Sequence, residues 1–178
     1  VEYAITPRTA RPRSLWKRFT SPAEEPVQVR SRFEAAAIAP DDVVIGAGAK
    51  PFIAYTIASV TDYGVGDEVI YPVPGFPIYE SQIAANGAVP VPIYLRESRG
   101  FAFDPAELEA KITPKTRLLI LNTPQNPTGG ILDRENLDAI AEILARHPQV
   151  WVFADEIYSR LVYDGLFDTL ATRPGMLE

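Results

Sequence analysis

Cysteine is absent from this chain, and histidine occurs only once, at His147. Without cysteine the chain can form no disulfide framework, no thiolate metal site and no cysteine nucleophile. A single histidine argues against a histidine-based metal site and against a Ser-His-Asp triad. The absence of disulfides fits a cytoplasmic protein, which is the location that we predict.

Long apolar runs are also missing. No run approaches the length of a membrane span, and the N-terminus lacks the apolar core of a signal peptide. We therefore expect no membrane segment and no secretion signal. With 178 residues, of which 47% are apolar and 22% charged, the chain is long enough for one domain with a real core.

An excess of positive charge is lacking as well, because the formal net charge is −6. Seven of the 17 basic residues lie in an N-terminal segment, residues 1–40, which also contains many prolines. Prolines disfavour the amphipathic helix of a transit peptide, so we interpret this segment as an atypical solvated arm. The acidic remainder does not suggest a nucleic-acid platform, and we predict no nucleic-acid partner.

Short apolar runs alternate with stretches of helical periodicity along the rest of the chain. We predict strands at Val43–Ile45, Asp67–Tyr71, Val89–Tyr94, Arg117–Leu121 and Val150–Ala154. We predict helices over 33–38, 49–61, 76–85, 104–112 and 133–146, and one or two helical turns over 157–162. Asp104 and Asp133 are the expected N-caps of the helices that begin there. This alternation predicts an α/β fold with a mostly parallel sheet flanked by helices. Alternating prolines suit Val89–Tyr94 to an edge or irregular strand. Leu118–Leu121 suits a strand buried on both faces, and we expect Val150–Ala154 to be a buried strand as well.

Three loops follow predicted strands, namely Gly46–Lys50, Pro72–Phe76 and Asn122–Gly130. Asp155 occupies a fourth such position, at the end of the predicted strand Val150–Ala154. The carboxyl ends of parallel strands meet on one rim, and open α/β sheets bind their ligands there. We therefore expect these loops to converge on a ligand site.

The loop Gly46–Lys50 leads into a helix. Backbone N–H groups at a helix start bind anions, and Lys50 adds a positive charge. The loop lacks the third glycine of a dinucleotide fingerprint and the second half of a P-loop. Taken alone, it is more often a tight strand-to-helix turn than a phosphate site.

Other polar and aromatic residues on this rim have similarly open interpretations. Asp155 needs a partner if it is buried, and a cationic ligand, a metal, a protein base or a helix start that it caps would supply one. Phe76 could stack on a flat ligand, Asn126 offers an amide and Tyr158 a phenol, although core and turn roles explain each alone. Together they fit a planar, phosphorylated aromatic ligand that contains nitrogen.

The order of these motifs resembles the class I/II aminotransferases, the fold-type I enzymes of the aspartate aminotransferase superfamily, which use pyridoxal 5′-phosphate. The resemblance covers about residues 41–165. It rests on Gly48–Lys50, Gly66–Tyr79, Ile112–Arg117, Asn122–Gly130 and Ala154–Tyr158. It implies transfer of an amino group between an amino acid and a 2-oxo acid, in a homodimer.

The resemblance also implies a role for each matching residue of the phosphate loop and the stacking position. The backbone at Gly48, Ala49 and Lys50 would hold the cofactor phosphate. Phe76 would stack on the pyridine ring.

Further along the chain, Asn126 and Tyr158 would hydrogen-bond the phenolic oxygen of the cofactor. Asp155 would pair with the pyridine nitrogen and keep it protonated, so that the ring accepts electrons. In this family the peptide bonds before the residues that match Pro74 and Pro127 are often cis.

The lysine that forms the Schiff base in this family lies beyond the residue that matches Asp155, and no lysine follows Asp155 here. We therefore predict no catalytic residue within the chain. Residues 41–178 would be part of a cofactor-binding large domain, inactive alone. A related lyase or synthase, and a non-catalytic module for cofactor binding or dimerisation, remain alternatives.

Overall fold

The structure, a computed structural model of the 178-residue chain, describes residues 40–164 and 166–177. The chain divides into two compact units, residues 1–45 and 46–178. In the first unit, the described part contains a short 3₁₀ helix, η2 (Pro40–Asp42). The helix predicted over 33–38 lies outside the described residues.

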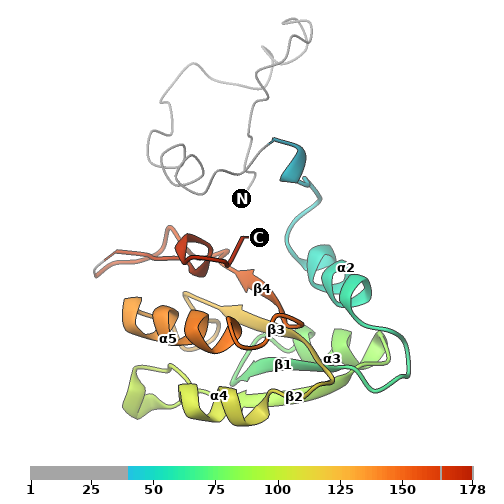
Figure 1. Cartoon of the computed structure of the whole chain (residues 1–178). Coiled ribbons are helices and arrows are strands. Elements are labelled where there is room, and N and C mark those ends of the chain that lie inside the picture. Colours follow the sequence, from blue (N-terminus) through green and yellow to red (C-terminus); the bar gives the residue numbers. More distant parts are fainter. Residues whose placement is uncertain (1–39, 165, 178) are drawn as a thin grey trace, which may run out of the picture. The chain divides into compact units, whose positions relative to one another are not determined.

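The second unit is built on a parallel sheet of four strands (Figure 1). The strands are β1 (Glu68–Val73), β2 (Val89–Tyr94), β3 (Thr116–Asn122) and β4 (Trp151–Asp155). Their order is β2-β1-β3-β4, and every neighbouring pair is parallel. The prediction of an α/β fold with a parallel sheet is therefore confirmed, and so is the edge position of the proline-rich strand β2.

In the described part of the chain, four helices cover the two faces of the sheet (Figure 1). They are α2 (Lys50–Val60), α3 (Ile78–Ala85), α4 (Pro105–Lys111) and α5 (Arg134–Leu144). Short 3₁₀ helices, η3 (Glu97–Arg99) and η4 (Leu170–Thr172), complete the described elements. Apolar side chains of α2 and α3 share one core cluster, and those of α4 and α5 share the other.

Strand β3 contributes to both clusters because successive side chains of a strand point to opposite faces. Leu118 and Ile120 lie in the cluster under α2 and α3. Leu119 and Leu121 lie in the cluster under α4 and α5. All four are at most 2% exposed, which confirms that this apolar run is buried on both faces.

Two predicted N-caps are also confirmed. The Asp104 carboxylate accepts a hydrogen bond from the Ala106 N–H at the start of α4. The Asp133 carboxylate accepts one from the Asn136 N–H at the start of α5. In both cases an aspartate satisfies a backbone donor that has no partner within the helix.

Three predictions of local structure are wrong. Val43–Ile45 forms no strand, because none of the described strands offers it a hydrogen-bonding partner. Strand β4 is not fully buried: it lies at an edge of the described sheet, and Trp151 is 63% exposed. Residues 157–160 form turns rather than a helix, with a hydrogen bond from the Ser159 N–H to the Glu156 carbonyl.

Within the described residues, no helix combines the length and the apolar character that crossing a membrane requires. The longest described helices, α2 and α5, have 11 residues each. About 20 residues would be needed to span the hydrocarbon core.

Tyr71 on β1 gives the fold a measurable dependence on alkaline pH. Burial, followed by a hydrogen bond and the charge of Glu80, raises the pKa of Tyr71 to about 12. In the unfolded chain tyrosine ionises near pH 10, so the unfolded state releases its proton first as the pH rises. The stabilisation is complete below about pH 10 and is lost between about pH 10 and pH 12.

We therefore expect the free energy of unfolding to fall more steeply over this range in the unsubstituted chain than in Tyr71→Phe. Urea unfolding at a series of pH values would measure both slopes. Equal slopes would contradict the assignment to Tyr71. The Tyr63→Phe variant is the control, because the Tyr63 side chain is 80% exposed.

Candidate functional site

The carboxyl ends of β1, β3 and β4 meet through side-chain hydrogen bonds. In the parallel ladder Asn122 at the end of β3 is the partner of Asp155 at the end of β4. The Gln125 side-chain amide donates to the Pro74 carbonyl at 2.7 Å and thereby joins the loop after β3 to the loop after β1. These contacts bring together the loops Pro72–Phe76 and Asn122–Gly130 with Asp155, as the sequence predicted.

Asp155 is a buried carboxylate with a neutral donor beside it. The Asp155 side chain is 8% exposed, and its Oδ2 accepts a hydrogen bond of 2.7 Å from the Tyr79 hydroxyl. Tyr79, in the first turn of α3, is itself fully buried. Burial is the largest cause that raises the pKa of Tyr79, followed by the charge of Asp155 and this hydrogen bond. Tyr79 therefore stays protonated and donates throughout the neutral range.

The negative charge of Asp155 has no protein counter-ion in the part of the chain that the structure describes. There, no lysine, arginine or histidine forms an ion pair with it. The same residues contain no group of three acidic or histidine side chains that could hold a metal ion. Because a buried carboxylate needs compensation, this environment suits a ligand that brings a positive charge.

Phe76 lies between Tyr79 and the start of α2. Its ring meets the Tyr79 ring edge-on, with centroids 5.8 Å apart and an interplanar angle of 88°. The Lys50 Nζ lies 5.7 Å from the centroid of the Phe76 ring. The residue just before Phe76 must be a glycine, Gly75, because a Cβ there would lie 2.2 Å from the Pro72 carbonyl oxygen. Phe76 is only partly buried, so its ring can serve as a stacking surface.

The start of α2 offers backbone donors beside this ring. Gly48 has φ +85°, a conformation that favours glycine, and a Cβ at this position would meet no atom within 4 Å. The N-cap, Ala49, has no side chain that could cap the helix. Within the described residues, no hydrogen bond satisfies the N–H groups of Ala49 and Lys50. Free N–H groups and an open backbone at a helix start suit an anion such as phosphate.

Asn126 and Tyr158 complete the predicted set. The Asn126 side chain is partly buried and makes no hydrogen bond within residues 40–164 and 166–177. Tyr158 lies in the turn after β4, close enough to Tyr79 for its charge to contribute to the raised Tyr79 pKa. The structure thus brings Phe76, Asn126, Asp155 and Tyr158 to one rim. The contact of Lys50 with Phe76 places the start of α2 at the same rim.

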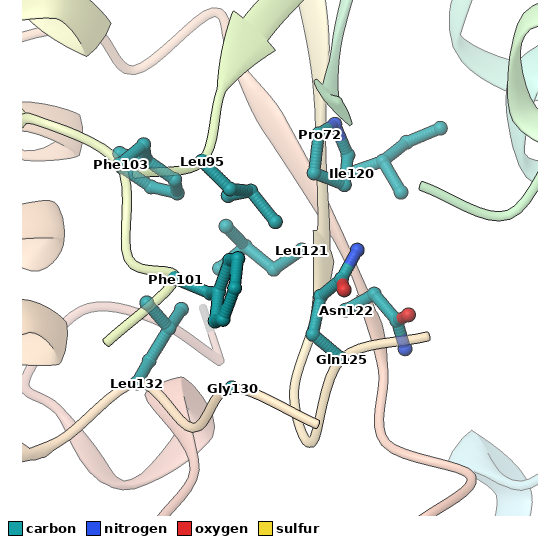
Figure 2. A pocket seen from close by; sticks show the side chains of 10 residues that line it. All are labelled: Pro72, Leu95, Phe101, Phe103, Ile120, Leu121, Asn122, Gln125, Gly130 and Leu132. Atoms are coloured by element: carbon teal, nitrogen blue, oxygen red, sulfur yellow. The ribbon is translucent and has the colours of Figure 1, made fainter. Parts of the chain in front are cut away.

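The loops after β1 and β3 contain cis peptide bonds. The peptide bonds before Pro74, Pro124 and Pro127 are cis, the first and last of them as expected. Behind the loop after β3 lies a small cavity, lined mainly by apolar side chains with Asn122 and Gln125 on one side (Figure 2). It offers about 10 Å³ to the centre of a water molecule, so it holds about one water and no ring-sized ligand.

Two residues that shape this rim did not stand out in the sequence. Tyr79 reads as a core residue of an α3 stripe, and Asn122 reads only as the end of an apolar run. The spacing of Tyr79 three residues after Phe76 was the available signal, because residues at this spacing share a helix face. Nothing local distinguishes Asn122 from a turn residue.

Comparison with known proteins gives a consistent family. The model of the family "Aminotransferase class I and II" matches residues 26–177. An aspartate/prephenate aminotransferase of Cereibacter sphaeroides is 42% identical over 139 residues, which are 78% of this chain and 34% of that protein. A bifunctional aspartate aminotransferase and glutamate/aspartate-prephenate aminotransferase of Petunia hybrida is 41% identical over 140 residues, 78% of this chain and 29% of that protein.

A solved structure agrees with these sequence matches. The aspartate aminotransferase of Rhizobium meliloti superimposes with a TM-score of 0.75 at 35% identity, over 83% of this chain and 38% of that one. The chain thus spans about a third of the length of the curated relatives that it matches.

Proposed function

Because this chain belongs to the class I and II aminotransferases, we propose that it forms part of the cofactor-binding domain of a pyridoxal-phosphate-dependent aminotransferase. The protein would transfer an amino group between an amino acid and a 2-oxo acid. The observation that carries the proposal is the buried Asp155 carboxylate, which has a neutral donor but no counter-ion among the described residues. A protonated pyridine nitrogen would supply the missing positive charge.

The other residues of the rim fit the same cofactor by their chemistry. The free N–H groups of Ala49 and Lys50, next to Gly48, would bind the phosphate group. The partly buried ring of Phe76 would stack on the pyridine ring. When bound, pyridoxal phosphate supplies an electron sink for the carbanion of the substrate.

Two further donors would orient the ring. The Asn126 amide and the Tyr158 hydroxyl would donate hydrogen bonds to its phenolic oxygen, and Asp155 would hold a proton on its nitrogen. A ring held at both the oxygen and the nitrogen can neither rotate nor slide over Phe76. By these assignments the chain binds and orients the cofactor, and it contributes no group that reacts with the substrate.

The larger assembly is also part of the proposal. Residues 41–178 would belong to one cofactor-binding domain, and residues 1–40 would be a separate segment. A homodimer is proposed by analogy with the family, together with a cytoplasmic location. Amino acid and 2-oxo acid define the substrate class.

Calorimetric titration of the chain with pyridoxal 5′-phosphate would test the proposal. We expect saturable binding that weakens roughly 30-fold or more in Asp155→Ala, because one partner of a buried charge pair is removed. In Asn126→Ala the loss of a hydrogen bond should weaken binding about 5- to 10-fold.

The matched control is Asp104→Ala, which removes a carboxylate that caps α4 and binds Arg99 and the Ala106 N–H rather than any of the proposed cofactor groups. It should lower stability by about 1 kcal/mol and leave the affinity unchanged. Absence of binding by the unsubstituted chain would contradict the proposed function, as would equal affinity in Asp155→Ala.

A further inference from the structure

Asn122 links two residues that belong to neighbouring strands and loops. Its side-chain Nδ2 donates to the Asp155 backbone carbonyl at 2.9 Å. Its Oδ1 accepts from the Asn126 backbone N–H at 2.8 Å. One side chain thus uses its donor toward β4 and its acceptor toward the loop after β3.

Because Asn122 is buried, both of these hydrogen bonds are needed to satisfy its side chain. Asn122 is 6% exposed, and a buried amide that loses a partner pays the desolvation cost of that group. A carboxamide is the short side chain that offers a donor and an acceptor from one planar group. Aspartate at this position would keep the acceptor and lose the donor, while alanine would lose both.

No other side chain of the rim makes this connection. Gln125 binds the Pro74 carbonyl with its amide nitrogen and the Thr128 N–H and hydroxyl with its oxygen. Gln125 therefore joins the loop after β3 to the loop after β1 and stabilises the conformation of its own loop. Tyr79 donates to the Asp155 carboxylate, and among the described residues no hydrogen bond joins it to Asn126. Asn122 alone among them joins the backbone of Asn126 to that of Asp155.

We propose that Asn122 is a positioning residue, which sets the distance between the Asn126 amide and the Asp155 carboxylate. This inference rests on the proposed function, in which these two groups bind the phenolic oxygen and the nitrogen of one pyridine ring. Asn122 touches neither the ring nor the phosphate in this proposal. Its effect reaches the ligand through the backbone of the two residues that it holds.

Titration with pyridoxamine 5′-phosphate, which forms no covalent link to lysine, would test the inference on the 178-residue chain. We expect Asn122→Ala to weaken binding about 10-fold, the equivalent of one to two hydrogen bonds of the ring. Binding of inorganic phosphate should not change, because none of the Asn122 side-chain hydrogen bonds reaches the start of α2. A general loss of structure would weaken the binding of both ligands alike.

The matched control is Asn86→Ala. Asn86 also donates from its amide to a backbone carbonyl, that of Gln82 at the end of α3, but it lies outside the rim. It should leave both affinities unchanged. In the background of Asn126→Ala, the effect of Asn122→Ala on the ring ligand should shrink, because one of the two positioned groups is already gone.

A measurement on the unsubstituted chain keeps the inference falsifiable if Asn122→Ala fails to fold. The backbone N–H proton of Asn126 should exchange slowly with solvent, since the Asn122 side chain accepts its hydrogen bond in a partly buried site. Fast exchange would overturn the inference, and so would an unchanged pyridoxamine phosphate affinity in a folded variant. If the unsubstituted chain binds no pyridoxamine phosphate, the proposed function fails and takes this inference with it.

Discussion

The substitution Leu119→Ala is expected to lower the free energy of unfolding by about 3 kcal/mol. The Leu119 side chain is fully buried in the cluster beneath α4 and α5. Its removal costs the transfer free energy of the lost methine and methyl groups, and the cavity that remains adds to this cost. Because the sheet lies between helices on both faces, the surrounding chain can close over the gap only in part.

The same reasoning applies to Leu118, which is fully buried in the opposite cluster beneath α2 and α3. Leu118→Ala should therefore cost a similar amount, although the two residues are adjacent in sequence. Urea unfolding would measure both values. Leu161→Ala is the control, since Leu161 is 55% exposed and its truncation should change stability by less than about 0.5 kcal/mol. A small loss at either core position would contradict burial on both faces.

The substitution Tyr79→Phe is expected to lower the free energy of unfolding by about 2 kcal/mol, because it removes a buried hydrogen bond to a charged group. The hydroxyl donates to Asp155 Oδ2 at 2.7 Å, and both side chains are shielded from solvent. The aromatic ring stays in place, so the packing against Phe76 is kept. The loss therefore reports the hydrogen bond rather than a cavity.

A double-mutant cycle with Asp155→Asn separates this hydrogen bond from other effects. In the Asp155→Asn background the acceptor is neutral, so Tyr79→Phe should cost less than in the unsubstituted chain. Strictly additive losses would contradict a direct interaction of Tyr79 with the charge. Tyr163→Phe serves as the control, because Tyr163 is 90% exposed.

Local patterns along the chain predicted most of the fold. The run Leu118–Leu121 predicted a strand buried on both faces, and the aspartates at 104 and 133 predicted helix starts. Prediction failed for the exposure of β4 and for Val43–Ile45. A short apolar run has the same composition whether neighbours cover it or not, so its position in a sheet depends on partners elsewhere in the chain.

The residues of the candidate site also fall into those that the sequence predicted and those that it did not. Phe76, Asn126, Asp155 and Tyr158 stood out because they follow predicted strands within recognisable motifs. Tyr79 and Asn122 did not, because a tyrosine on a helix stripe and an asparagine after a strand usually have structural roles. Their contacts to Asp155 span 76 and 33 positions in the sequence.

The sequence by itself determined the family, the parallel α/β arrangement and the loops that meet at the rim, since these depend on periodicity and on residues close together in the chain. Only the tertiary structure decided what surrounds Asp155. Folding places β3 and β4 in register and packs α3 beneath them, so that a phenol and an amide reach the same residue. Hydrogen bonds between distant segments arise from that packing, and no local pattern encodes them.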